Sequence, residues 1–272
     1  MSNKFDQIQW VIQKNLIDQN DLRSLINSFE KLGIDYIEVE IMPFVSDLPF
    51  IDSSKAPIFY GSTTMGELVR KNPVMATGFF FDEASFSMEN YFKRWGAHML
   101  NFGASITSLG ELMNEEYDAD KYFFIRPDDD SKSFSGEVIK FSEIKKWYNQ
   151  LLQSESRMLT VESKIIVSEP YHLKYEWRLW IVNRKVITAS KYREDFRLKK
   201  EMGCPETVIQ FAEERCKEYT PHDVFVMDIC QTGDELYIIE CGCLNSAGFY
   251  ASNLELIVQN VSEYYIEKNM SQ

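Results

Sequence analysis

The chain has 272 residues, of which 44% are hydrophobic and 26% are charged; this composition is typical of a globular protein and excludes an extensively disordered one. Aspartate and glutamate outnumber lysine and arginine by 42 to 29, and the net charge of -13 argues against general binding to nucleic acid or to anionic membranes. No apolar run approaches the ~20 residues that a membrane span needs, and the first residues lack the apolar core of a secretory signal, so we expect a cytoplasmic protein.

The first part of the chain alternates between strand and helix patterns, which is typical of an open α/β sheet. Gly33 ends the first helical pattern, as a glycine after a helix commonly does. We therefore predict a small α/β domain over residues 1–115. Its predicted strands cover residues 8–13, 35–44 and 56–62, and its predicted helices cover residues 20–33 and 87–100.

From about residue 120 the pattern changes to longer strands separated by a few helices. This order predicts an α+β domain of antiparallel sheets over residues 116–272. The predicted strands cover residues 121–127, 136–141, 164–170, 175–182, 185–192, 224–230 and 236–241, and the predicted helices cover residues 142–152, 205–219 and 253–268.

The two strands of the predicted hairpin around "QTGDE" each carry one carboxylate, Asp228 or Glu240, among apolar neighbours. A buried carboxylate without a partner is costly and two facing acids repel, so we expect a cation beside them. We predict a hairpin loop of odd length, or a bulge with the same effect, because either places Asp228 directly across from Glu240. The alternative is an acid on the exposed face of an edge hairpin.

Cysteines offer a different metal hypothesis. Cys241 and Cys243 form a CxC that could be half of a zinc site, but the five cysteines show no CxxC spacing and the chain has three histidines. We therefore expect reduced thiols that act as small strand residues.

Three further stretches carry candidate binding residues, and each also has an ordinary structural explanation. "FIRPDDDSKSFSGEV" holds Arg126 and Lys132 around a loop that could lay donors over phosphates, although a solvated hairpin loop would look the same. "EWRLWIVNRKVITASKY" places Glu176 and Arg178 on one strand face, with Lys191 on the returning strand; an exposed ribbon is the alternative.

The third stretch, "SEPYHLKYE", runs from a strand end at Ser168 through Glu169 to Tyr171. A hinge of this kind can offer backbone groups to the edge of an adenine, between apolar walls. Taken alone, it is a loop that contains a proline.

In this order, the short motifs resemble those of the ATP-grasp family, in its divergent clade that includes the eukaryotic cell-division-cycle protein assisting assembly of a translation initiation factor. The resemblance covers about residues 122–250 and rests on the "EWR" hairpin and on the strands of Asp228 and Glu240. It implies an ATP-grasp fold, with ATP between two α+β subdomains and Mg²⁺ bound by two acids and an asparagine. Gly242 stands where that asparagine is usual, so Asn245 is our substitute ligand.

The resemblance also implies the activity of a carboxylate–amine ligase, in which ATP converts a carboxylate to an acyl phosphate that an amine attacks. Arg126, Lys132 and Arg178 would then hold phosphate oxygens, and the substrate would be a small molecule, a peptide or a protein. Two alternatives stay open: an ATP-binding assembly factor that acts on a protein partner, and a phosphotransferase that stops at the phosphorylated product.

Overall fold

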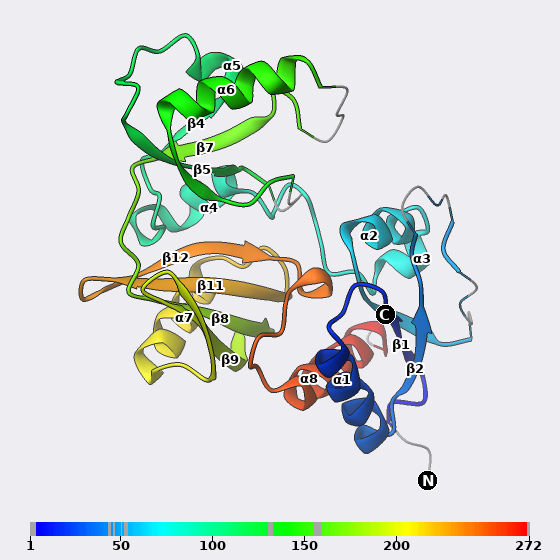
Figure 1. Cartoon of the computed structure of the whole chain (residues 1–272). Coiled ribbons are helices and arrows are strands. Elements are labelled where there is room, and N and C mark those ends of the chain that lie inside the picture. Colours follow the sequence, from blue (N-terminus) through cyan, green and yellow to red (C-terminus); the bar gives the residue numbers. More distant parts are fainter. Residues whose placement is uncertain are drawn as a thin grey trace.

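The computed structural model describes residues 4–42, 45, 47–49, 51, 54–129, 133–154 and 159–270. These residues form three sheets (Figure 1). A four-stranded sheet lies above a five-stranded sheet, and a three-stranded sheet with its helices lies beside them. The chain has an α+β architecture, as the sequence predicts.

The three-stranded sheet is parallel, with the order β2 (Asp35–Val39), β1 (Ile8–Gln13), β3 (Ala56–Tyr60). Helix α1 (Gln19–Leu32) is capped by the Asp18 side chain and ends at Gly33, whose φ of 66° favours glycine. Helices α2 (Thr63–Arg70) and α3 (Pro73–Ala76) follow β3. Helix α8 (Leu254–Met270), far along the chain, packs beside α1 and completes this core.

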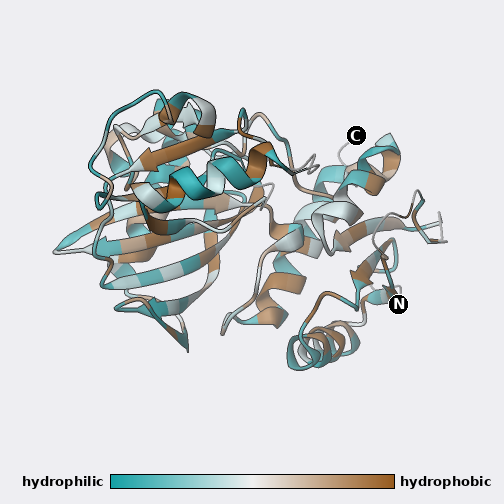
Figure 2. Ribbon diagram, turned by 45° about the horizontal axis from the view of Figure 1, so that its top comes forward, coloured by the Kyte–Doolittle hydropathy of each residue, from teal (hydrophilic) through white to brown (hydrophobic). Residues whose placement is uncertain are grey.

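The four-stranded sheet is antiparallel, with the order β4 (Ser105–Ser108), β7 (Lys164–Ser168), β5 (Tyr122–Pro127), β6 (Glu137–Lys140). Helices α5 (Leu109–Leu112) and α6 (Phe141–Leu152) share its core of buried apolar side chains. Hydrophobic and hydrophilic residues alternate around such helices, as the brown and teal segments of Figure 2 show.

The five-stranded sheet is also antiparallel, with the order β10 (Arg197–Met202), β9 (Lys185–Glu194), β8 (Tyr175–Val182), β11 (Val224–Thr232), β12 (Glu235–Gly242). Side chains of α4 (Met88–Trp95) and α7 (Glu206–Glu218) join its core, and the short helices η1 (Gly96–His98) and η2 (Leu244–Ser246) follow α4 and β12.

The division expected between residues 115 and 116 stays a prediction. Strand β4 pairs with β7 although it precedes that point, and α8 packs on α1 although it follows it. In the part of the chain that the structure describes, no helix combines the length and the apolar character that crossing a bilayer requires. The expected cytoplasmic location also stays a prediction.

Candidate functional site

The two acids of the β11–β12 hairpin lie directly opposite each other. The hairpin has a two-residue loop, with Thr232 paired to Glu235, but a bulge changes the register between Ile229 and Asp228. Because one extra residue reverses the alternation of side chains, Asp228 pairs with Glu240 and both side chains share one face of the sheet. The prediction of a bulge with this effect is confirmed.

Each acid is paired with an arginine. Arg178 lies across from Asp228 on β8 and donates to both carboxylate oxygens, from Nε to Oδ1 at 2.9 Å and from Nη2 to Oδ2 at 2.8 Å. Glu240 accepts from Arg126, which reaches down from β5 of the four-stranded sheet. Guanidinium groups are therefore the cations that compensate these acids, and they bring charge from both sheets to one place.

A third acid extends this network. Glu176 is 4% exposed, accepts a hydrogen bond from the Tyr192 hydroxyl at 2.9 Å and pairs with Arg193 at 3.3 Å. Burial raises the pKa of the Glu176 carboxyl, and Arg193 and Tyr192 offset part of that rise. Burial likewise raises the pKa of Asp228, which Arg178 partly offsets. Both acids therefore depend on their cationic neighbours to stay ionised.

The network lines a cavity of about 580 Å³ between the four-stranded and five-stranded sheets. Side chains such as Phe124, Leu173 and Ile239 give it apolar walls. Lys132, which the sequence analysis placed with these residues, lies outside the described part of the chain. The charged side chains discussed above that line the cavity are Arg126, Arg178, Arg193, Glu176, Asp228 and Glu240.

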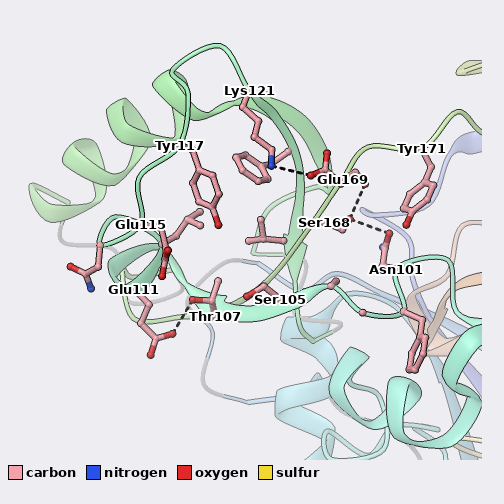
Figure 3. A pocket seen from close by; sticks show the side chains of 17 residues that line it. Asn101, Ser105, Thr107, Glu111, Glu115, Tyr117, Lys121, Ser168, Glu169 and Tyr171 are labelled. Carbon is pink, nitrogen blue, oxygen red and sulfur yellow. Dashed lines mark hydrogen bonds and ion pairs between the residues drawn. The ribbon is translucent and has the colours of Figure 1, made fainter.

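The hinge residues line a second cavity of about 740 Å³ (Figure 3). Ser168 donates to Oδ1 of Asn101 at 3.2 Å, and Glu169 pairs with Lys121 at 3.0 Å. Tyr171 and Asn101 line both cavities, so the hinge lies between them. The structure brings Tyr171 to the cavity of the paired acids, whereas Ser168 and Glu169 line the neighbouring one.

Lys191 does not join the acids. Its ammonium group pairs with Glu194 and Glu201, each at 2.8 Å, and Lys191 is not among the residues that line the first cavity. Lys191 lies opposite Trp177, which packs in the core on the other face of β8 from Arg178. The expected role for Lys191 in nucleotide binding is therefore not supported.

A bulge explains both this difference and a residue that the sequence analysis missed. The β8–β9 register changes between Glu176 and Trp177, so that Arg193 instead of Lys191 lies across from Glu176. Simple alternation along β9 cannot reveal such a change. A second basic residue two positions after Lys191 is the one signal that the sequence contains.

Asn245 is not a metal ligand in this arrangement. It is fully buried, and its amide nitrogen donates to the carbonyl oxygens of Phe59 and Gly78 while its side-chain oxygen accepts from the Phe80 N–H at 2.7 Å. These partners belong to β3 and the segment that follows α3. Asn245 therefore fixes the loop after β12 to the three-stranded sheet, which corrects the expected ligand set.

Comparison with solved structures identifies the same fold in several ligases. The chain is similar to a RimK domain ATP-grasp protein from Sphaerobacter thermophilus, with 11% identity over 95% of this chain and 98% of that chain, and a TM-score of 0.56. It is similar to D-alanine–D-alanine ligase from Bacillus anthracis, with 11% identity, coverage of 96% and 99%, and a TM-score of 0.51. It is also similar to the macrocyclase MdnC bound with precursor peptide MdnA from Microcystis aeruginosa, with 14% identity, coverage of 96% and 99%, and a TM-score of 0.55.

No curated protein sequence matches the chain. A family model that describes an ATP-grasp domain, the third family of one clade, matches residues 81–261. These residues include the four-stranded sheet, the five-stranded sheet and both arginine–acid pairs. On this match and on the fold, the chain belongs to the ATP-grasp family.

Proposed function

We propose that the chain is an ATP-dependent ligase that joins a carboxylate to an amine. A carboxylate oxygen would attack the γ-phosphorus of ATP and release ADP; the amine nitrogen would then attack the acyl carbon, lose a proton and expel phosphate. The observation that carries this proposal is the pairing of Asp228 with Arg178 and of Glu240 with Arg126 in a cavity between two sheets. The ATP-grasp fold implies ATP binding.

The arginines suit the phosphates of ATP. Arg178 has five N–H donors, of which two are bound by Asp228 and one by the Gly248 carbonyl at 3.3 Å. The two that are left over can form a fork toward phosphate oxygens. Arg126 would approach the same phosphates from the opposite sheet, and Lys132 remains part of the proposal as a third cation.

The acids suit Mg²⁺. Asp228 and Glu240 lie opposite each other, and each carboxylate retains lone pairs beyond those that its arginine uses. Mg²⁺ is commonly held by one or two carboxylates together with substrate phosphates, so these two residues fit it without Asn245. The ion would neutralise phosphate charge. On binding, the arginines would exchange part of their contact with the acids for contact with the nucleotide.

A smaller cavity of about 350 Å³ suits the amine. It lies at the carboxyl ends of β1 and β3, where the strand order β2–β1–β3 changes direction and where ligands bind in open α/β sheets. Gly248 lines it and also binds Arg178, so this cavity adjoins the first. Asp18 and Asp21 line it as well; burial and repulsion from Asp18 raise the pKa of Asp21, and an ammonium group would relieve that repulsion.

The reaction can be tested without knowledge of the substrates. The protein is incubated with a cell extract, MgATP and hydroxylamine, which converts acyl phosphates to hydroxamates that mass spectrometry detects. We expect an ATP-dependent hydroxamate and, without hydroxylamine, a condensation product with matching release of ADP. The matched control is Arg178→Lys, which keeps the charge but loses the planar fork and should lower the yield strongly. ATP consumption without either product would contradict a ligase.

A second candidate is an ATP-binding assembly factor that acts on a protein partner, and the exposed edge strand β10 favours it. All six residues of β10 are exposed, and two of them are large apolar residues, Leu198 at 66% and Met202 at 70% exposure. The resemblance to the clade of the translation-initiation-factor assembly protein points the same way. Capture of a protein partner that depends on ATP, with no new covalent bond in either molecule, would favour this candidate over a ligase.

A further inference from the structure

Tyr250 has an unusual backbone conformation beside the cavity of the paired acids. Its φ of 53° lies in the left-handed region, which bulky aromatic residues rarely adopt. The residue lines the cavity, and the N–H of the next residue, Ala251, donates to Ser190 Oγ on β9 at 3.1 Å. A conformation of this kind persists only where the surroundings hold it, and such residues cluster at functional sites.

The Tyr250 ring covers the flat face of the Arg178 guanidinium. The Arg178 Cζ atom lies 4.9 Å from the ring centroid, a distance typical of a cation–π contact. On the Tyr192 side, the two tyrosine rings stack at 4.7 Å with an interplanar angle of 11°. The guanidinium is therefore held at its edges by Asp228 and the Gly248 carbonyl, and over its face by Tyr250.

These contacts differ in what happens to them when a nucleotide binds. Under the proposed function, Mg²⁺ takes up part of the coordination of Asp228, which weakens the edge contact of that carboxylate with Arg178. The ring of Tyr250 and the carbonyl of Gly248 do not bind the metal, so they can keep the guanidinium in the same plane throughout.

We propose that Tyr250 is a positioning residue, which orients the two remaining N–H groups of Arg178 toward the γ-phosphate of ATP. This inference rests on the proposed function, because it requires a nucleotide in the cavity. It assigns no contact between Tyr250 and the nucleotide. It also gives a reason for the left-handed backbone: a turn in this conformation brings the ring over Arg178 while Gly248 stays within reach of the same side chain.

The test separates the γ-phosphate from the rest of the nucleotide. Calorimetry measures the affinities of the whole protein for Mg-ADP and for the ATP analogue Mg-AMP-PNP, and their ratio reports the contribution of the γ-phosphate. We expect Tyr250→Phe to keep the ratio, because it keeps the ring. We expect Tyr250→Asn, which tolerates the left-handed backbone but lacks the ring, to lower the ratio about tenfold with Mg-ADP affinity nearly unchanged.

The control is Arg184→Asn. Arg184 also has a left-handed backbone, with φ of 67°, but it lies in the turn between β8 and β9 and lines none of the cavities described above. Its ratio should equal that of the wild type. An unchanged ratio in Tyr250→Asn, or an equal loss for both nucleotides, would overturn the inference and leave the proposed function standing. A wild-type protein that binds neither nucleotide would overturn both.

Discussion

Asn245 and Asp228 are both buried polar side chains, but they are satisfied in different ways. Asn245 binds backbone groups of Phe59, Gly78 and Phe80, which cannot leave without distorting the chain. Asp228 binds the side chain of Arg178, which can rotate toward a ligand. Burial is similar in the two cases, so it does not identify a binding residue. The kind of partner does, because only a partner that can be exchanged leaves room for a ligand.

The largest expected effect comes from breaking the Asn245 side of this comparison. Asn245→Ala leaves one N–H and two carbonyl groups without partners in the interior, so we expect the free energy of unfolding to fall by about 3–5 kcal/mol. Denaturant titration measures it. The affinity of the remaining folded protein for MgATP should be unchanged. A selective loss of Mg²⁺-dependent binding at full stability would instead restore Asn245 as a ligand.

The Asp228 side can be broken in two ways. Arg178→Met leaves a buried carboxylate without its cation, and we expect a loss of about 3 kcal/mol of unfolding free energy. Adding Asp228→Leu removes that charge too, so the double variant should recover most of the stability while still failing to bind MgATP. Denaturant titration and calorimetry on the same samples make the comparison. A double variant as unstable as the single one would mean that the pair contributes by shape and not by charge.

The two acids of the hairpin should themselves differ. The Asp228 side chain is 4% exposed and that of Glu240 is 33% exposed, so water screens Glu240 more effectively. We expect Asp228→Asn to weaken Mg²⁺-dependent ATP binding by about 1.5–3 kcal/mol, and Glu240→Gln by about 1 kcal/mol. Calorimetric titration at fixed Mg²⁺ checks the order. Unchanged affinity in both variants would remove the hairpin acids from the site.

Glu89 extends the comparison to an exposed acid and gives the smallest effect. Hydrogen bonds from Lys93 and Lys164 lower the pKa of Glu89 to about 2. Because this value lies below the ordinary 4.5, the stability that Glu89 contributes is present above that pH and is lost as the pH falls toward 2. We expect the melting temperatures of the wild type and Glu89→Gln to differ slightly near neutral pH and to converge in acid. A constant difference across the whole pH range would contradict this.

The sequence predicts local features of the site well. The hairpin of Asp228 and Glu240, its bulge and the strand that carries Arg178 all follow from apolar runs and turn residues. It does not predict that the cation beside Glu240 is Arg126, because that contact joins two sheets. The error at Lys191 arises from a bulge that no residue type in β9 announces.

Asn245 was misassigned for a related reason. The interpretation as a ligand assumed that a residue shortly after an acid stays close to it, but the chain turns away from the hairpin through η2 toward the three-stranded sheet. Its partners lie 165 to 186 positions earlier in the chain. Sequence distance gives no information about a hydrogen bond of that range.

The packing of α8 beside α1 has a consequence for how the protein is made. The indole N–H of Trp10 donates to Ser262 Oγ at 2.9 Å, and the two residues are 252 positions apart. During synthesis the three-stranded sheet therefore leaves the ribosome long before the helix that covers it. Its apolar face stays exposed while both other sheets are translated and can fold, and a nascent chain in this state is a natural target for chaperones until α8 arrives.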